Sequence, residues 1–89
     1  MKLKEARKFI RQESGRWGLK PPKVLLSISP CFSYDVDPPH RPTVVLTENS
    51  TWDTVAHELA HYFTYIKLEH TYHGQDHELF MQDILFDLD

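Results

Sequence analysis

Histidine is concentrated in the second half of this 89-residue chain. Five of the six histidines fall within 21 positions: His57, His61, His70, His73 and His77. Histidine is the commonest metal ligand among the side chains, and its pKa lies near neutral pH. A chain of this length buries only about 60–65% of its unfolded surface, so a bound metal ion would add to the stability of a modest core. The cluster therefore favours a chemical role for these residues over a packing role.

The pattern of apolar residues predicts an α+β domain. Helical and strand periodicities indicate five elements: a helix over residues 2–16, strands over 24–29 and 43–47, a helix from 52 to 67 or 69, and a helix over 76–88. Pro21 and Pro22 prevent the first helix from continuing, and Ser50 or Thr51 can cap the second. Residues 30–42 are expected to form a loop or an irregular hairpin. The prediction is one domain over residues 1–89, with an N-terminal helix, a small β-sheet and two further helices.

His57, Glu58 and His61 form the motif H-E-x-x-H inside the second predicted helix. Residues four apart lie one above the other on a helix, so both imidazoles can reach one Zn²⁺ at about 2.0–2.1 Å. Glu58 lies further round the helix, where it cannot join them as a ligand but can take a proton from water. The motif therefore predicts two zinc ligands and a general base.

A catalytic zinc ion typically has three protein ligands, so a third ligand is expected. The candidates by distance along the chain are Glu69, His70, His73, His77 and Glu78. A continuing helix would carry Glu69 and His70 past the metal, whereas the chain can fold back before His73 and His77. Gly74 permits a tight turn directly after His73, and His77 would lie in the first turn of the last helix. These arguments from the residues leave both His73 and His77 as candidates for the third ligand.

Two segments together resemble the SprT-like metalloprotease family: residues 57–61 (His-Glu-Leu-Ala-His) and residues 73–77 (His-Gly-Gln-Asp-His). That family pairs H-E-x-x-H with a downstream His-Gly and an apolar helix. The resemblance covers residues 43–86 and implies a minimal zincin-like domain. The zinc ribbon that often follows the family's protease domain is not expected, because the chain has one cysteine.

The resemblance also implies a set of site residues. Zn²⁺ would be held by His57, His61 and His73, with Glu58 as the catalytic acid and base. The family usually has Trp or Phe where this chain has His77, so two alternatives stay open: an exchange of ligand to His77, or His77 as an extra polar group in the site. The implied function is that of a zinc metalloendopeptidase acting on a protein or peptide substrate, with a metal-activated water and Glu58 as general base.

Some features of this function are left open by the sequence. Candidate donors to the developing oxyanion are Tyr72, His70 and His77. The strand over residues 43–47 could hold an extended peptide if it lies at a sheet edge, and would be an ordinary core strand otherwise. The alternative function is a non-catalytic, zinc-stabilised module that binds protein or DNA, although a purely structural site has no need of Glu58.

The distribution of charge and the remaining composition suggest the setting of the protein. Residues 1–20 carry seven basic and two acidic side chains, and residues 48–89 carry nine acidic side chains and one basic. The basic first helix is either a solvated face packed near the acidic half or a surface for an acidic partner or DNA. The chain shows no signal peptide, no membrane-spanning run and no cysteine pair. A cytoplasmic monomer without membrane association is expected.

Overall fold

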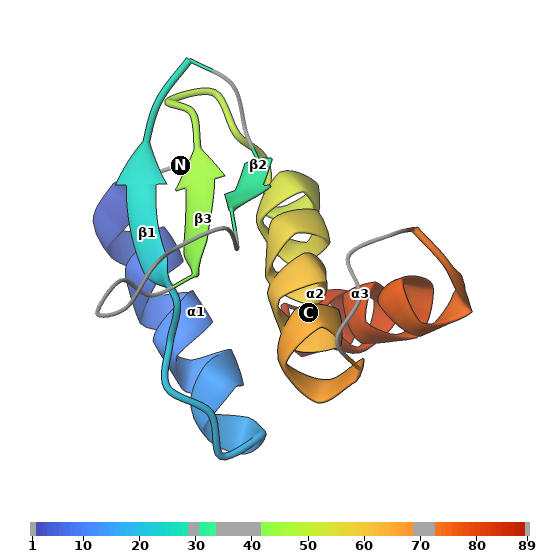
Figure 1. Cartoon of the computed structure of the whole chain (residues 1–89). Coiled ribbons are helices and arrows are strands. Elements are labelled where there is room, and N and C mark those ends of the chain that lie inside the picture. The colour runs from blue at the N-terminus through green and yellow to red at the C-terminus, as the bar shows by residue number, and fades with distance from the viewer. Residues whose placement is uncertain (1, 29–30, 34–41, 69–72, 89) are drawn as a thin grey trace.

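The computed structural model describes residues 2–28, 31–33, 42–68 and 73–88, and it confirms the α+β class. The described elements are α1 (Leu3–Arg16), β1 (Lys23–Leu26), β2 (Cys31–Ser33), β3 (Thr43–Leu46), α2 (Trp52–Leu68) and α3 (Gln75–Asp87). Figure 1 shows the strands as a small sheet in front of α1 and beside α2, with α3 crossing the lower part of α2. None of these helices is long and apolar enough to cross a membrane.

The sheet has the strand order β1-β3-β2, with β1 parallel and β2 antiparallel to β3. Its register aligns Val24 with Val44 and Cys31 with Val45. Because β3 is central, the alternative that places residues 43–47 at a sheet edge is wrong and the core-strand alternative is confirmed. β2 lies in the segment predicted as a loop or irregular hairpin, and its antiparallel pairing agrees with the hairpin.

The end of α1 is a Schellman motif, which explains why the helix stops before the proline pair. The N–H of Leu19 donates to the carbonyl of Ser14 at 3.0 Å, and the N–H of Gly18 donates to the carbonyl of Gly15 at 3.1 Å. Gly18 has a φ of 69°, in the left-handed region that costs glycine no steric penalty. The turn directs the chain from the end of α1 into β1.

α2 runs through the core because its apolar residues recur at helical spacing. The Oγ1 of Thr51 accepts a hydrogen bond from the N–H of Thr54 at 3.3 Å, which makes Thr51 rather than Ser50 the N-cap. The buried apolar side chains of α2 are Val55, Ala56, Leu59, Ala60, Tyr62 and Phe63. Ile66 recurs at the same helical spacing, yet it is 38% exposed, and the last turns of α2 extend beyond the sheet (Figure 1). The core thus holds the middle of α2, where the H-E-x-x-H motif lies.

α3 packs against α2 through Ile84, which is fully buried, and Met81, which is partly buried. Trp17, just after α1, joins the same contact: its ring centroid lies 6.2 Å from that of Phe63 on α2 and 5.5 Å from that of Phe80 on α3. Aromatic pairs at these distances stabilise beyond the area they bury. The packing fixes the start of α3 against the middle of α2.

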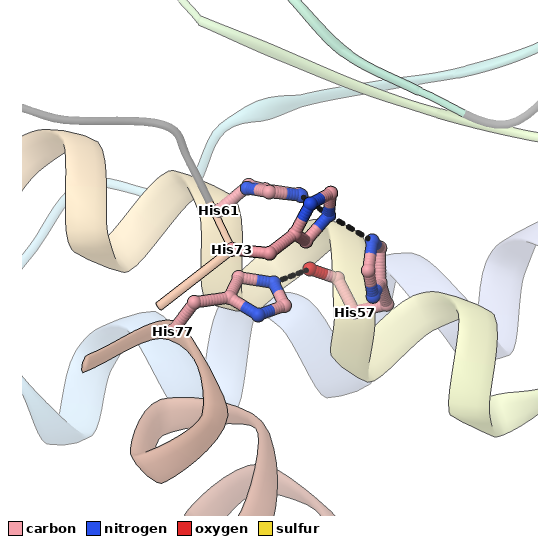
Figure 2. A group of neighbouring side chains, drawn as sticks. All are labelled: His57, His61, His73 and His77. Atoms are coloured by element: carbon pink, nitrogen blue, oxygen red, sulfur yellow. Dashed lines mark hydrogen bonds between the residues drawn. The ribbon is translucent and has the colours of Figure 1, made fainter. Parts of the chain in front are cut away.

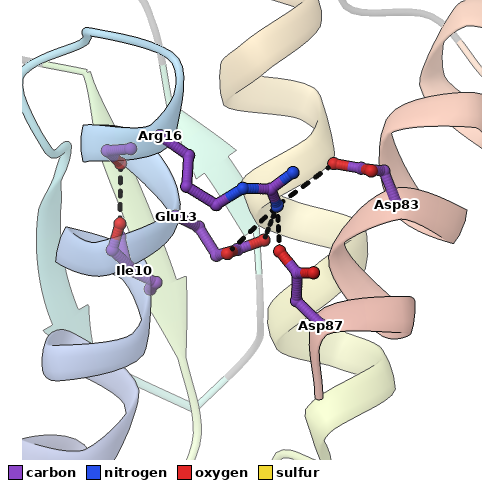
Figure 3. A network of polar contacts seen from close by, with 6 residues as sticks. Ile10, Glu13, Arg16, Asp83 and Asp87 are labelled. Carbon is purple, nitrogen blue, oxygen red and sulfur yellow. Dashed lines mark hydrogen bonds and ion pairs between the residues drawn. The ribbon is translucent and has the colours of Figure 1, made fainter. Parts of the chain in front are cut away.

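A polar network also joins α1 to α3 (Figure 3). The Nη1 atom of Arg16 lies 3.2 and 3.3 Å from the two carboxylate oxygens of Glu13, and it also contacts the carboxylates of Asp83 and Asp87. The side chain of Glu13 is buried. Burial and the neighbouring Asp87 raise the pKa of Glu13 to about 7, although Arg16 opposes the shift. The network therefore contains a carboxyl group that titrates near neutral pH.

Replacement of Glu13 by Gln (E13Q) is expected to flatten the pH dependence of stability. Glu13 has a pKa of 4.5 when unfolded and about 7 when folded, so the wild type loses stability as the pH rises through this window. Glutamine stays neutral, which should remove a loss on the order of 1–3 kcal/mol. Chemical denaturation at about pH 5 and pH 8 measures the difference, with E5Q at an exposed position of α1 as the control. An E13Q protein with the wild-type slope would contradict the titration of Glu13.

Candidate metal centre

Four histidines from α2 and from the start of α3 lie in one cluster (Figure 2). His57 and His61 are one turn apart on α2, and their ring centroids are 4.8 Å apart. His73 directly precedes Gly74, the N-cap of α3, and His77 lies in the first turn of α3. The ring of His77 is centred 4.7 Å from that of His57 and 4.2 Å from that of His61. The packing of α3 on α2 thus brings His73 and His77 next to the two histidines of α2.

The rings of His57 and His61 both direct their Nε2 atoms at the Nε2 of His73. The Nε2 of His73 lies 3.0 Å from the Nε2 of His61 and 3.1 Å from the Nε2 of His57. A neutral imidazole nitrogen either donates one hydrogen or offers one lone pair. Hydrogen bonds alone therefore match the Nε2 of His73 poorly to both neighbours at once, whereas a cation between the three nitrogens would take up all three lone pairs.

The donor set fits a transition-metal ion. Two nitrogens bound to one tetrahedral zinc ion are about 3.3–3.4 Å apart, so the separations of the Nε2 of His73 from its two neighbours would need to widen by only about 0.2–0.4 Å. One ligand atom from each of the four histidines lies within 4.8 Å of the others, and the group could hold a metal ion. Imidazole nitrogen suits zinc, copper, iron and nickel alike, so the ligands do not by themselves identify the metal.

His77 makes a different contact from the other three histidines. Its Nε2 lies 2.9 Å from the backbone carbonyl oxygen of His57. A carbonyl oxygen only accepts, so the Nε2 of His77 carries the hydrogen and donates it (Figure 2). The ring of His77 is buried. It therefore holds the backbone at His57 against the start of α3.

The surroundings keep His57 in the form that a metal requires. Burial lowers the pKa of His57, and the neighbouring rings of His77 and His73 lower it further, because each would repel a second positive charge. A metal ion binds the neutral imidazole and competes with the proton for the same nitrogen. The cluster thus offers an uncharged ring at neutral pH.

Glu58 lies beside the histidines without belonging to their group. The residue is only 5% exposed, and burial raises the pKa of its carboxyl group. One carboxylate oxygen lies 3.7 Å from the Nε2 of His57. Both residues line an open cavity of about 410 Å³, together with Asp53, Thr54 and Met81. A buried carboxyl group therefore faces a space that a small molecule or a side chain could enter, next to the converging nitrogens.

The other candidates from the sequence fall into two groups. Glu78 does not belong to the histidine group, and its Oε1 accepts a hydrogen bond from Gln82 at 3.4 Å. Glu69, His70 and Tyr72 lie outside the described residues. Of the candidates in the described part of the chain, His57, His61, His73 and His77 are brought together.

Three residues that line the cavity were not among the site residues predicted from the sequence: Asp53, Thr54 and Met81. Asp53 and Thr54 lie four positions before His57 and Glu58 on the same helix, so helical spacing could have placed them on the motif's face. Met81 reaches the cavity from α3. Only the packing of the two helices could reveal its position.

Comparisons with known proteins assign neither a family nor a function to this chain. A scan against protein-family models found no match, and searches of curated proteins and of solved structures found none either. What can be said of the function therefore rests on the four histidines, on Glu58 and on the cavity beside them.

Proposed function

We propose that the protein is a zinc-dependent metallopeptidase whose ligands are His57, His61 and His73. The observation that supports this most strongly is the convergence of three Nε2 atoms beside the buried carboxyl group of Glu58. Three imidazole ligands with an open fourth position are typical of catalytic zinc sites. The motif's resemblance to the SprT-like family leads to the same ligands and the same general base.

The contacts of the two remaining histidines favour His73 over His77 as the third ligand. The Nε2 of His73 points at the corresponding atoms of His57 and His61. The Nε2 of His77 instead donates to the carbonyl of His57. Hydrogen bonds of this kind from a neighbouring side chain position the ligands of a metal. His77 is thus proposed as a positioning residue for His57.

The chemistry proposed for the site divides between the metal and the protein. Zinc, when bound, would polarise the scissile carbonyl and acidify a water molecule. Glu58 would take the proton of the attacking water and return it to the leaving amine. Burial raises the pKa of Glu58, which makes the protonated form needed in the second step easier to reach. Asp53, Thr54 and Met81 would contact the substrate from the cavity wall.

The same geometry reduces the number of candidates for the group that donates a hydrogen bond to the developing oxyanion. A neutral imidazole carries one N–H, and in His77 this group donates to the carbonyl of His57. This argues against His77 as the group that donates to a developing oxyanion. Tyr72 and His70 stay candidates for that role.

A second function is favoured by one observation. Because all four histidines have ligand atoms within 4.8 Å of one another, the group could also close around a metal with four ligands. Closed four-ligand sites are typical of structural zinc. In that case the protein would be a zinc-stabilised module that binds protein or DNA without catalysis. The two functions predict different outcomes for the same experiment.

The zinc-loaded protein should hydrolyse unfolded casein or an internally quenched peptide, and a chelator should abolish this hydrolysis. Restoring one equivalent of zinc should restore it. Chelation should also lower the melting temperature, since a ligand at 100 times its Kd stabilises the fold by about 2.7 kcal/mol. A protein that loses stability on chelation but cleaves nothing when loaded would support the binding module and contradict the peptidase.

A further inference from the structure

β1 is an edge strand of the sheet, and β3 is its one neighbour among the described strands. Lys23 and Ser27 donate their backbone N–H groups to the carbonyls of Pro42 and Leu46, on the side of β3. Because successive residues of a strand face opposite sides, the N–H and C=O groups of Val24 and Leu26 point outward. Among the described residues, only one contact to these outward groups is found, from Arg7 to the carbonyl of Val24.

A groove of about 350 Å³ lies along this edge, between β1 and α1. We name it the basic groove, and its described lining residues are Arg7, Ile10, Arg11, Pro21, Pro22, Lys23, Val24 and Leu25. Three of these residues are cationic and none is acidic. No ion pair links Arg7, Arg11 or Lys23 to any residue in the part of the chain that the structure describes.

Apolar side chains stand exposed on the same strand. Leu25 is 41% exposed and Leu26 is 47% exposed, although both belong to the sheet. Side chains of an added strand would lie beside them at the usual cross-strand distance, where apolar pairs stabilise. Backbone pairing, charge and apolar contact are thus available on one short edge.

We propose that the basic groove binds an extended acidic segment of a partner protein, which adds to the sheet as a fourth strand beside β1. The segment's backbone would pair with the outward groups of Val24 and Leu26, as in other cases of strand addition. Its carboxylates would meet Arg7, Arg11 and Lys23. β1 spans about 13 Å, so four or five residues of the segment would cover it.

The cationic side chains of Arg7, Arg11 and Lys23 should attract acidic segments to this edge and disfavour the pairing of other strands. Charged side chains on edge strands prevent sheets from pairing with any neighbouring chain. Here the Nη2 of Arg7 donates a hydrogen bond to the outward carbonyl oxygen of Val24 at 3.1 Å. A neutral or basic strand would have to displace that contact and leave the cations without partners, whereas an acidic strand would pair with them.

The groove fits a peptide better than a single-stranded nucleic acid. Single-stranded DNA and RNA bind through base stacking on aromatic side chains as well as through phosphate contacts. No aromatic residue is found among the described residues that line the groove. The outward hydrogen-bonding groups of β1 match a peptide backbone, and phosphates would leave the outward carbonyl of Leu26 without a donor.

Fluorescence polarisation with labelled ten-residue peptides tests the proposal. A peptide of alternating Glu and Val should bind at least about tenfold more tightly than the same peptide with Gln for Glu at low salt. Methylating alternate backbone nitrogens on the pairing side should abolish binding, because it removes the donors that strand addition needs. Mass spectrometry confirms that the peptide stays intact. Equal binding of the Glu and Gln peptides, or of the methylated peptide, would overturn the proposal.

Matched charge reversals locate the binding surface. R11E and K23E should each weaken binding of the Glu-Val peptide by roughly tenfold. K8E changes the charge equally at an exposed residue of α1 outside the groove, and it should have little effect. Equal weakening by K8E, or tighter binding of a 20-nucleotide oligo-dT than of the peptide, would overturn the proposal in favour of a general attraction for anions. Circular dichroism confirms that each variant is folded.

Discussion

Substitution of Glu58 by Gln (E58Q) is expected to lower kcat for peptide hydrolysis by about 10²–10⁴-fold and to leave zinc affinity nearly unchanged. Glu58 does not belong to the histidine group, so its loss removes no ligand. Glutamine keeps the size of the side chain but cannot take a proton from water. The cavity that Glu58 lines with His57 should keep its shape. Initial rates on a quenched peptide, together with zinc titration, measure both quantities.

The control for this variant is E78Q. Glu78 lies on α3 outside the histidine group, and the substitution changes the charge in the same way. E78Q should hydrolyse the peptide at the wild-type rate. If E58Q cleaves as fast as E78Q, then Glu58 is not the general base and a different group must take the proton.

The part of the site that could be predicted from the sequence is the part that one helix encodes. The spacing of His57 and His61 implies a shared face of α2, because a helix has a fixed repeat and a capping residue marks the start of this one. His73 and His77 reach this face only through the packing of α3, which depends on contacts such as those of Ile84 and Trp17. Local periodicity contains no information about such contacts, so it could not decide whether His73 or His77 is the third ligand.

The features of the fold that could not be predicted from the sequence have a similar origin. β2 is three residues long, and a strand this short presents too little alternation to be recognised between prolines. The parallel pairing of β1 with β3 and the central place of β3 are non-local and cannot be read from either strand alone. Glu13 falls at a position on the apolar stripe of α1, but its burial depends on its partners Arg16 and Asp87.

The second large effect is expected from His73→Ala (H73A), which should lower zinc affinity by orders of magnitude. The Nε2 of His73 lies 3.1 Å from that of His57 and 3.0 Å from that of His61. His77→Ala should cost about 10–100-fold, as is usual when a hydrogen bond that positions a ligand is lost. Competition with a chromophoric zinc chelator measures both affinities under the same conditions.

A further variant separates positioning by His77 from a merely structural role. Glutamine at position 77 (H77Q) can still donate a hydrogen bond to the carbonyl of His57, so it should recover most of the affinity that H77A loses. Alanine and glutamine variants with equal zinc affinity would contradict the positioning role. A loss from H77A as large as that from H73A would indicate that His77 is itself a ligand.

In the proposed site, three histidine side chains hold one zinc ion beside Glu58. X-ray absorption spectroscopy of the zinc-loaded wild type, with the metal content determined on the same sample, tests it most directly. We expect one zinc ion per chain, three imidazole nitrogens at about 2.0–2.1 Å and one further light-atom ligand. A chain that takes up no zinc on titration would contradict the claim, and so would a zinc ion coordinated by four imidazoles.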